Sequence, residues 1–344
     1  MAKARDYLVV TASYWGFTLV DGALRMVVLL HFFQLGYAPL TLSFLFLLYE
    51  LAGIGANLAG GWLAVRFGIP RLLVAGQALQ IAGLLLLSAL DPAWSATLSV
   101  GWVVVAQGIA GLAKDFTKTA SKSAIKATAG QAAGQLFRWV AWFTGSKNAM
   151  KGLGFFVGGL LLQAAGFRGA LLLMALGIAG ILLAGVFLLP RDLGKAKASR
   201  SMRELFAKSR GVNLLAAARV LLFGARDVWF VVGLPVFLYA AGWRFAEVGG
   251  FLAAWTIVYG GLQAMAPRLV AHGSDGLSDE LSAARLWAGL LLAVPVALAI
   301  LLPWIGPGGS ACLVIVALSL FALPFAVNSS LHSYLILAYA GSEK

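Results

Sequence analysis

Long apolar segments alternate with short polar connections along most of this chain of 344 residues. A helix that crosses a lipid bilayer needs about 20 consecutive, mostly apolar residues. Ten segments satisfy this criterion: residues 7–34, 41–65, 71–90, 97–120, 135–164, 168–190, 212–239, 246–270, 284–304 and 309–336. The connections contain residues that break helices, such as Asp91-Pro92 and Pro303. The pattern therefore predicts an all-α polytopic membrane protein with ten spans.

Composition supports this prediction. Hydrophobic residues make up 61% of the chain, charged residues only 11%, and the mean hydropathy is +0.90. Soluble domains contain about 45–50% apolar and about 25% charged residues, so a soluble fold is excluded. The single cysteine, Cys312, cannot by itself form a disulfide, a zinc site or a thiol-based active site. We expect no cofactor, no metal and no nucleic-acid partner.

The distribution of Lys and Arg predicts the orientation, because cytoplasmic connections carry an excess of positive charge. Alternate connections hold Lys3 and Arg5, Arg66 and Arg71, Lys122 and Lys126, a basic run from Arg191 to Arg210, then Arg268 and Arg285. The opposite connections hold only Arg168 and Arg244. The first set is expected to be cytoplasmic. Because ten spans is an even number, both ends of the chain should lie in the cytoplasm, with the protein in the inner membrane.

The longest polar stretch divides the chain into unequal parts. We expect an N-terminal bundle of six helices at residues 1–190, a cytoplasmic linker at 191–211, and a partial C-terminal bundle of four helices at 212–344. The two parts show a weak internal repeat. An offset of 206 positions (227 minus 21) places Asp227 on Asp21, Gly242 on Gly36 and Trp243 on Tyr37.

This plan resembles the major facilitator superfamily. The connection Gly61 to Arg71, GWLAVRFGIPR, is similar to the superfamily's loop signature G-x-L-A-D-R-x-G-R-R, with Val65 in place of the Asp. The run Gly154 to Gly159, GFFVGG, is similar to the fifth-helix antiporter motif ending G-P-x-x-G-G, with Phe155 in place of the Pro. The resemblance implies twelve spans, so the second half of this chain is expected to lack the last two.

Several predicted spans contain ionisable residues. A charge at the centre of a bilayer costs roughly 2.5–3.5 kcal/mol, so it needs a partner or a function. Asp21 and Arg25 are four residues apart in the first span, so they lie on one side of a helix and can pair with each other. Glu50 in the second span is a candidate proton carrier, although packing against a neighbouring helix explains it equally well.

Lysines dominate the fourth and fifth spans. Lys114 and Lys118, beside Asp115, either line a cavity or belong to a snorkelling helix end. Lys147 and Lys151 are one turn apart in a span without an acidic residue, so they either bind substrate or pair with Asp115 or Asp21. The seventh span contributes Arg219, Arg226 and Asp227.

These charges predict a cavity that binds an anion. The expected substrate-binding residues are all cationic: Arg25, Lys114, Lys118, Lys147, Lys151, Arg219 and Arg226. The expected proton-coupling residues are the fewer carboxylates: Asp21, Glu50, Asp115 and Asp227. Arg matches phosphate-like oxygens in a bidentate manner, whereas Lys supplies a point charge. A carboxylate beside a cation can gain or lose its proton when a substrate anion binds that cation.

A closer resemblance covers residues 6–268 and depends on charged blocks. These are Asp21 to Arg25 (DGALR), Ala113 to Asp115 (AKD), Lys122 to Lys126 (KSAIK), Phe143 to Gly152 (FTGSKNAMKG) and Phe223 to Phe230 (FGARDVWF). Together they resemble the ArsJ-type organoarsenical efflux permeases. The resemblance implies export of 1-arseno-3-phosphoglycerate, the ester formed when glyceraldehyde-3-phosphate dehydrogenase uses arsenate instead of phosphate.

Two alternatives remain. The first is an organophosphate or multidrug antiporter of the same superfamily. The second is a membrane-embedded enzyme or sensor, which is disfavoured because the sequence shows neither a metal cluster, nor a nucleophile–base pair, nor an appended soluble domain. The residues alone support an anion transporter, and arsenic follows only from the resemblance.

Overall fold

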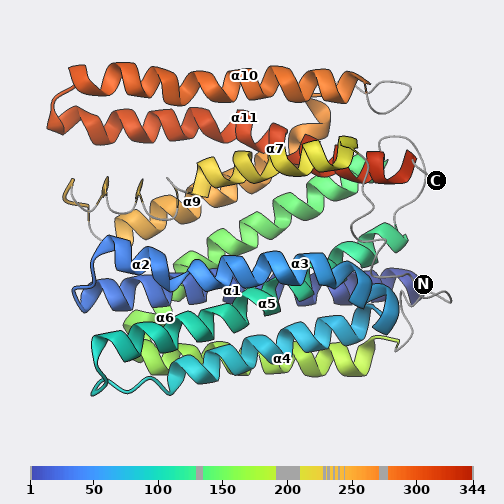
Figure 1. The fold of residues 1–344 in the computed structure, drawn as a ribbon, viewed down its shortest axis with the longest axis vertical. Helices are drawn as coiled ribbons and strands as arrows, with labels where there is room; N and C mark the ends of the chain where they lie inside the picture. The colour runs from blue at the N-terminus through green and yellow to red at the C-terminus, as the bar shows by residue number, and fades with distance from the viewer. Residues whose placement is uncertain are drawn as a thin grey trace. The chain divides into compact units, whose positions relative to one another are not determined.

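The computed structural model describes residues 2–128, 135–190, 210–227, 245–270 and 278–342, together with residues 230, 233–234, 237–238 and 241–243. Some side chains within these helices, including those of Arg138 and Asp227, lie outside this description. All regular structure in the described ranges is helical, as predicted (Figure 1).

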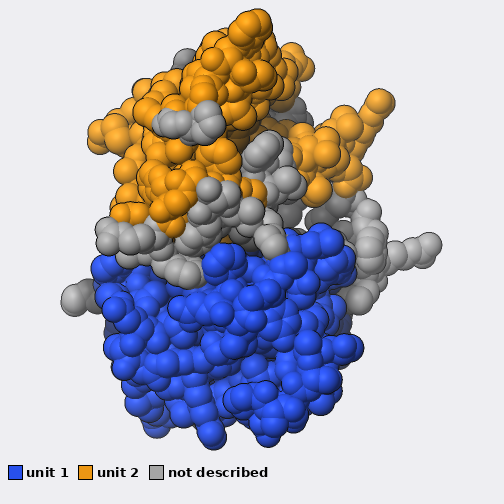
Figure 2. Space-filling model, turned by 90° about the vertical axis from the view of Figure 1, so that its left-hand side faces the viewer, with its two compact units in different colours: residues 1–128, 153–206 blue, residues 129–152, 207–344 orange. Residues whose placement is uncertain are grey.

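The contacts between residues divide the chain into two compact units, coloured separately in Figure 2. The first unit contains residues 1–128 and 153–206, and the second contains residues 129–152 and 207–344. Residues 129–152 thus group with the second unit, although the sequence prediction placed them in the N-terminal bundle. The predicted linker, residues 191–211, lies almost entirely outside the described residues, so the predicted domain boundaries stay a prediction.

The first unit is built around α5. Its helices are α1 (Ala2–Gln34), α2 (Pro39–Leu45), α3 (Leu47–Phe67), α4 (Ile69–Ser88) and α5 (Ala96–Thr128). It also contains residues 153–188 of α6 (Gln135–Leu188). α5 contacts α1, α2, α3 and α4. Phe17 and Leu24 of α1, Leu84 of α4 and Leu171 of α6 meet in a fully buried apolar core. This core holds α1, α3 and α5 together, and these three helices carry the charged residues described below.

Breaks between helices follow local chemistry. The predicted span 41–65 is divided at Phe46 into α2 and α3. α3 ends at Gly68, whose φ of +88° suits a residue without a Cβ, and Pro70 lies in the first turn of α4, where no backbone donor is needed. Within α6, Gly166 has φ +67° and separates the two predicted spans 135–164 and 168–190.

The second unit is built around α11. It contains residues 135–152 of α6, which we call the first part of α6. Its other helices are α7 (Arg210–Asp227), α9 (Phe245–Met265), the 3₁₀ turn η3 (Ala266–Arg268), α10 (Ser278–Leu301), the 3₁₀ turn η4 (Leu302–Trp304) and α11 (Pro307–Ser342). α11 contacts α7, α9 and α10. Tyr259 of α9 and Phe325 of α11 are the largest fully buried side chains in its core.

Seven helices in the described residues are long and apolar enough to cross a membrane. The longest apolar stretch, Ala141–Leu188, contains the break at Gly166, and two shorter apolar helices, Leu40–Ala56 and Asn213–Gly224, lie where further spans were predicted. Large apolar side chains also cover outer surfaces, for example Phe187 of α6 and Leu292 and Ile300 of α10, all highly exposed. Apolar surfaces of this kind suit contact with lipid, so the chain is a multi-pass membrane protein.

Candidate functional site

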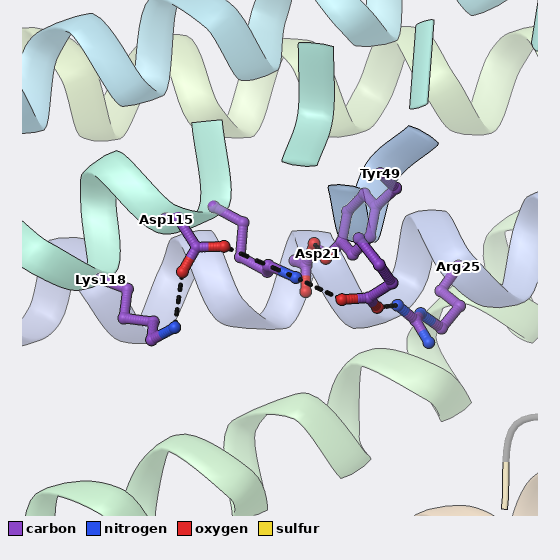
Figure 3. Close-up of polar contacts among 7 residues, drawn as sticks. Asp21, Arg25, Tyr49, Asp115 and Lys118 are labelled. Carbon is purple, nitrogen blue, oxygen red and sulfur yellow. Dashed lines mark hydrogen bonds and ion pairs between the residues drawn. The ribbon is translucent and has the colours of Figure 1, made fainter. Parts of the chain in front are cut away.

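Three helices of the first unit bring charged side chains to one place (Figure 3). Arg25 comes from α1, Glu50 from α3 and Lys114 from α5. Arg25 Nη2 lies 2.8 Å from Glu50 Oε1, and Lys114 Nζ lies 3.2 Å from Glu50 Oε2. Each carboxylate oxygen therefore contacts a different cation. We call Arg25, Glu50 and Lys114 the clamp, because two cations hold one carboxylate between them.

The clamp continues along α5. Lys114 Nζ also lies 3.8 Å from Asp115 Oδ2, while Asp115 Oδ1 accepts a 2.5 Å hydrogen bond from Lys118 Nζ. Asp115 is buried, so two lysines neutralise a charge that would otherwise be costly in an apolar interior. The result is an alternating row, Arg25, Glu50, Lys114, Asp115 and Lys118, which the close-up shows as dashed contacts. Lys114 and Lys118 are thus paired and partly buried, and their roles as cavity-lining or snorkelling residues stay a prediction.

Exposure differs sharply along this row. The side chain of Arg25 is 12% exposed and that of Asp115 only 5%, whereas that of Glu50 is 52% exposed. The cations are thus fixed by the fold, but the carboxylate between them lies at an accessible edge. Glu50 is thus the most accessible of the three clamp side chains.

The predicted pairing of Asp21 with Arg25 is not found. Arg25 pairs with Glu50, and the carboxylate of Asp21 instead accepts a 2.5 Å hydrogen bond from the hydroxyl of Tyr49. The packing of α3 against α1 brings Glu50 to the guanidinium of Arg25 and the hydroxyl of Tyr49 to the carboxylate of Asp21. The spacing of four residues correctly placed both charges on one side of α1, but it could not show which helix would face that side.

Tyr49 connects the clamp to Asp21, and the sequence analysis missed it. Its ring lies beneath both cations: the guanidinium carbon of Arg25 is 5.1 Å and Lys114 Nζ is 4.0 Å from the ring centroid. The ring of Phe46 also faces Arg25, with its centroid 5.2 Å from the guanidinium carbon. The only available signal was that Tyr49 precedes Glu50, and neighbours in sequence rarely indicate a shared site.

Two glycines allow this arrangement. A Cβ on Gly111 of α5 would lie 2.1 Å from the carbonyl oxygen of Tyr49, and a Cβ on Gly53 of α3 would lie 2.5 Å from Asp115 Oδ2. α3 and α5 therefore pack with their backbones in contact, as small residues permit in membranes. This close approach lets a lysine of α5 reach a carboxylate of α3.

The second unit holds cations of a different character. Arg219 Nη1 donates a 2.6 Å hydrogen bond to Ser333 Oγ of α11, and its guanidinium lies 4.7 Å from the ring centroid of Phe223. Arg226 lies over Phe223 and Phe325, at 5.0 and 5.4 Å. Within the described part of the chain, Arg219 forms no ion pair with a carboxylate. The side chain of Asp227, the predicted proton carrier here, lies outside the described residues.

Lys147 and Lys151 also belong to the second unit, where their side chains are partly buried on the first part of α6. Between them, Asn148 enters a buried amide network that the sequence did not reveal. Asn148 Nδ2 donates to Gln263 Oε1, and Gln263 Nε2 donates to Tyr259 Oη at 2.7 Å and to Ser329 Oγ at 2.8 Å. This network connects α6, α9 and α11, and it fixes the helix face that carries the two lysines.

The chemistry available at these residues is electrostatic binding. The described residues contain no cluster of three or more His, Cys, Asp or Glu that could hold a metal ion. Cys312 is exposed. The clamp and its row of alternating charges can bind an oxyanion in place of Glu50, and the carboxylates can take up protons. Whether each residue does so stays a prediction.

Comparisons with known proteins identify the family. The sequence profile described as Major Facilitator Superfamily matches residues 7–344. Among solved structures, the chain is similar to the proton:xylose symporter XylE of that superfamily bound to 6-bromo-6-deoxy-D-glucose, with a TM-score of 0.62 and 14% sequence identity. The similarity covers 98% of this chain and 82% of XylE. No curated protein matches the chain significantly. This multi-pass, all-helical chain belongs to the major facilitator superfamily of membrane transporters.

Proposed function

We propose that this protein is a secondary transporter that exports a small organic anion in a proton-coupled manner, with 1-arseno-3-phosphoglycerate as its substrate. One observation carries the proposal. Arg25 and Lys114, which are 89 positions apart (114 minus 25), meet on the two oxygens of a single carboxylate, Glu50. A site that holds one oxyanion with two cations can hold another oxyanion of similar size.

The geometry of the clamp suits a phosphate or arsenate group. The planar guanidinium of Arg25 can form two parallel hydrogen bonds to such a group, and Lys114 adds a point charge from a second direction. Glu50 occupies this place with a half-exposed side chain, so an incoming anion can reach the two cations and compete with it. In this proposal Glu50 keeps the cations neutral while the site is empty of substrate.

The balance of charges supports proton coupling. In the first unit three cations, Arg25, Lys114 and Lys118, pair with the carboxylates of Glu50 and Asp115, and a third carboxylate, Asp21, is joined to this group through the hydroxyl of Tyr49. The group is neutral when all six are ionised. An anion that takes the cations from Glu50 leaves this carboxylate with excess negative charge nearby, and protonation removes that charge at the least cost. Anion binding should therefore be accompanied by proton uptake at Glu50.

The cations of the second unit are assigned to substrate binding as well. Arg219 is held by a hydroxyl and an aromatic ring, which orient its guanidinium without neutralising it. Arg226, Lys147 and Lys151 add further positive charge to this unit. In a transporter that works by alternating access, these residues would bind anionic groups of the substrate, and Asp227 would serve as a second proton carrier.

The identity of the substrate rests on the resemblance to the ArsJ-type permeases. Arsenic in the ester is pentavalent and bonded to oxygen, so its recognition requires cations and hydrogen-bond donors rather than soft thiolates. An exposed, single Cys312 is compatible with this chemistry. Glyceraldehyde-3-phosphate dehydrogenase would supply the ester, and the transporter would remove it across the inner membrane.

Everted membrane vesicles provide the test, because an exporter accumulates its substrate inside them. Radiolabelled arsenate ester and glycerol 3-phosphate are offered separately to vesicles containing wild-type protein or the variants Arg25→Ala, Lys147→Ala and Arg226→Ala at equal expression. We expect uptake of the ester in the wild type and its loss in the variants. Preference for glycerol 3-phosphate would instead support an organophosphate transporter. Full arsenate resistance in cells that carry the Lys147→Ala or Arg226→Ala variant would refute the assignment of these residues.

A further inference from the structure

We infer that Tyr49 is a positioning residue that transmits the protonation state of Asp21 to the two cations of the clamp. This inference rests on the proposed function, since it explains how a proton on one residue changes anion binding at others. Its basis is that Tyr49 contacts Asp21 through its hydroxyl and both clamp cations through its ring, whereas Asp21 and Arg25 interact electrostatically without forming an ion pair.

Tyr49 uses its two ends for different partners. Its hydroxyl donates a 2.5 Å hydrogen bond to Asp21 Oδ1, and its ring faces both Arg25 at 5.1 Å and Lys114 at 4.0 Å. The residue is 2% exposed, so water does not compete for either interaction. A cation over an aromatic face is attracted by the ring quadrupole, and the attraction is stronger when the pair is desolvated. The ring therefore contributes to the position of each cation.

The backbone of Tyr49 packs tightly against α5. Its carbonyl oxygen faces Gly111, where an added Cβ would lie only 2.1 Å away. A response to Asp21 is therefore expected mainly in the side chain. A hydrogen bond to an ionised carboxylate is roughly twice as strong as one to a neutral group. Protonation of Asp21 weakens this bond, frees the ring, and so loosens the placement of Arg25 and Lys114.

Other charged and titratable groups around Tyr49 must be considered in the same test. α1 contributes Tyr14, Asp21 and Arg25, α3 contributes Glu50, and α5 contributes Lys114, Asp115 and Lys118. α2 has no titratable side chain, and the only charged residue of α4, Arg71, lies in its first turn. Glu50 contacts the same two cations directly, so its contribution to the pH dependence is measured separately with Glu50→Gln.

The test separates the hydroxyl of Tyr49 from its ring. Tyr49→Phe removes the hydroxyl and keeps the ring, whereas Tyr49→Leu removes both. Tyr37→Phe is the matched control, since Tyr37 packs against Phe32 outside the clamp. Uptake of radiolabelled arsenate ester into everted vesicles is measured from mildly acidic to mildly alkaline pH for these variants and for Asp21→Asn.

We expect Tyr49→Phe and Asp21→Asn to lose the same part of the pH dependence, and the double variant to lose no more than either. We expect Tyr49→Leu to raise KM about tenfold, as the loss of two cation–π contacts implies. Tyr37→Phe should retain the wild-type profile. A Tyr49→Phe variant with an unchanged pH profile, or an Asp21→Asn variant with an unchanged profile, would overturn the inference.

Thermal unfolding of the purified proteins without any anion measures the coupling between Asp21 and Tyr49 independently of transport. The single variants Asp21→Asn and Tyr49→Phe and their double variant form a cycle, and their effects on the unfolding temperature should be non-additive. If the wild type transports neither the arsenate ester nor glycerol 3-phosphate, the proposed function fails and the inference fails with it. If the wild type transports the ester but the cycle is additive, only the inference about Tyr49 fails.

Discussion

Gly36 and Gly242 end helices in the same way, 206 positions apart (242 minus 36), with φ values of +81° and +88°. The surrounding hydrogen bonds repeat at the same offset. Leu35 N–H donates to His31 O and Ala241 N–H to Phe237 O, while Tyr37 N–H donates to Phe32 O and Trp243 N–H to Leu238 O. These bonds are typical of a helix that closes on a left-handed residue. The weak repeat in the sequence thus corresponds to a repeated backbone geometry.

This shared geometry predicts equal costs for equal substitutions. Gly36→Ala and Gly242→Ala should each destabilise the protein by about 1 kcal/mol, because the left-handed conformation disfavours a Cβ although both sites have open space. Gly224→Ala is the control, since Gly224 lies within helix α7 and also has open space. Thermal unfolding in detergent measures the three variants. A neutral effect at Gly242 beside a large effect at Gly36 would contradict the structural repeat.

Glu50→Gln should bind the anionic substrate more tightly than the wild type does. Glutamine cannot neutralise Arg25 and Lys114, so the substrate no longer competes with an internal carboxylate. In the wild type, lower pH protonates Glu50 and should strengthen anion binding, and this part of the pH dependence should disappear in the variant. Equilibrium binding of the arsenate ester at several pH values checks both expectations.

Asp91→Asn provides the matched control for Glu50→Gln. It also removes one negative charge, but Asp91 is exposed in a connection, where its carboxylate accepts a hydrogen bond from Ala93 N–H. Its anion affinity should equal that of the wild type. Weaker binding by Glu50→Gln would show that Glu50 contacts the substrate favourably rather than competing with it.

Gly111→Ala should disrupt the clamp by separating α3 from α5. The added Cβ would clash with the carbonyl oxygen of Tyr49, and relief of that clash moves Lys114 away from Glu50. We expect at least a tenfold loss of anion affinity, equivalent to about 1.4 kcal/mol. Gly101→Ala, on the same helix but with open space, should have little effect. Equal losses in both variants would indicate a general effect on α5 rather than a local clash.

Arg219→Ala and Arg25→Ala should differ in their effects on stability. Removal of Arg25 takes one of the two described cations from Glu50, whereas the described partners of Arg219 are a hydroxyl and an aromatic ring. Arg219→Ala should therefore reduce transport without leaving a carboxylate unpaired, and unfolding temperatures should separate the two variants. A large loss of stability in Arg219→Ala together with normal transport would assign Arg219 a purely structural role.

The sequence predicted the helical class, the membrane location and the family, because apolar length and local motifs are properties of consecutive residues. It placed Asp21 with Arg25, and Lys114 with Lys118, on shared helix faces, because helical spacing is also local. It could not predict that Glu50 rather than Asp21 would contact Arg25, or that Tyr49 would lie beneath two cations. Those contacts depend on how α1, α3 and α5 pack, and in turn on Gly111, whose importance appears only once the neighbouring backbone is known.

The joint at Gly166 has a consequence for how the protein is made. Two apolar segments meet there through a single non-helical residue within the stretch Ala141–Leu188. A joint this short keeps the second apolar segment next to the first, and an apolar segment is unfavourable in water, so neither should insert long before the other. The two should leave the ribosome and enter the bilayer together as one helical hairpin.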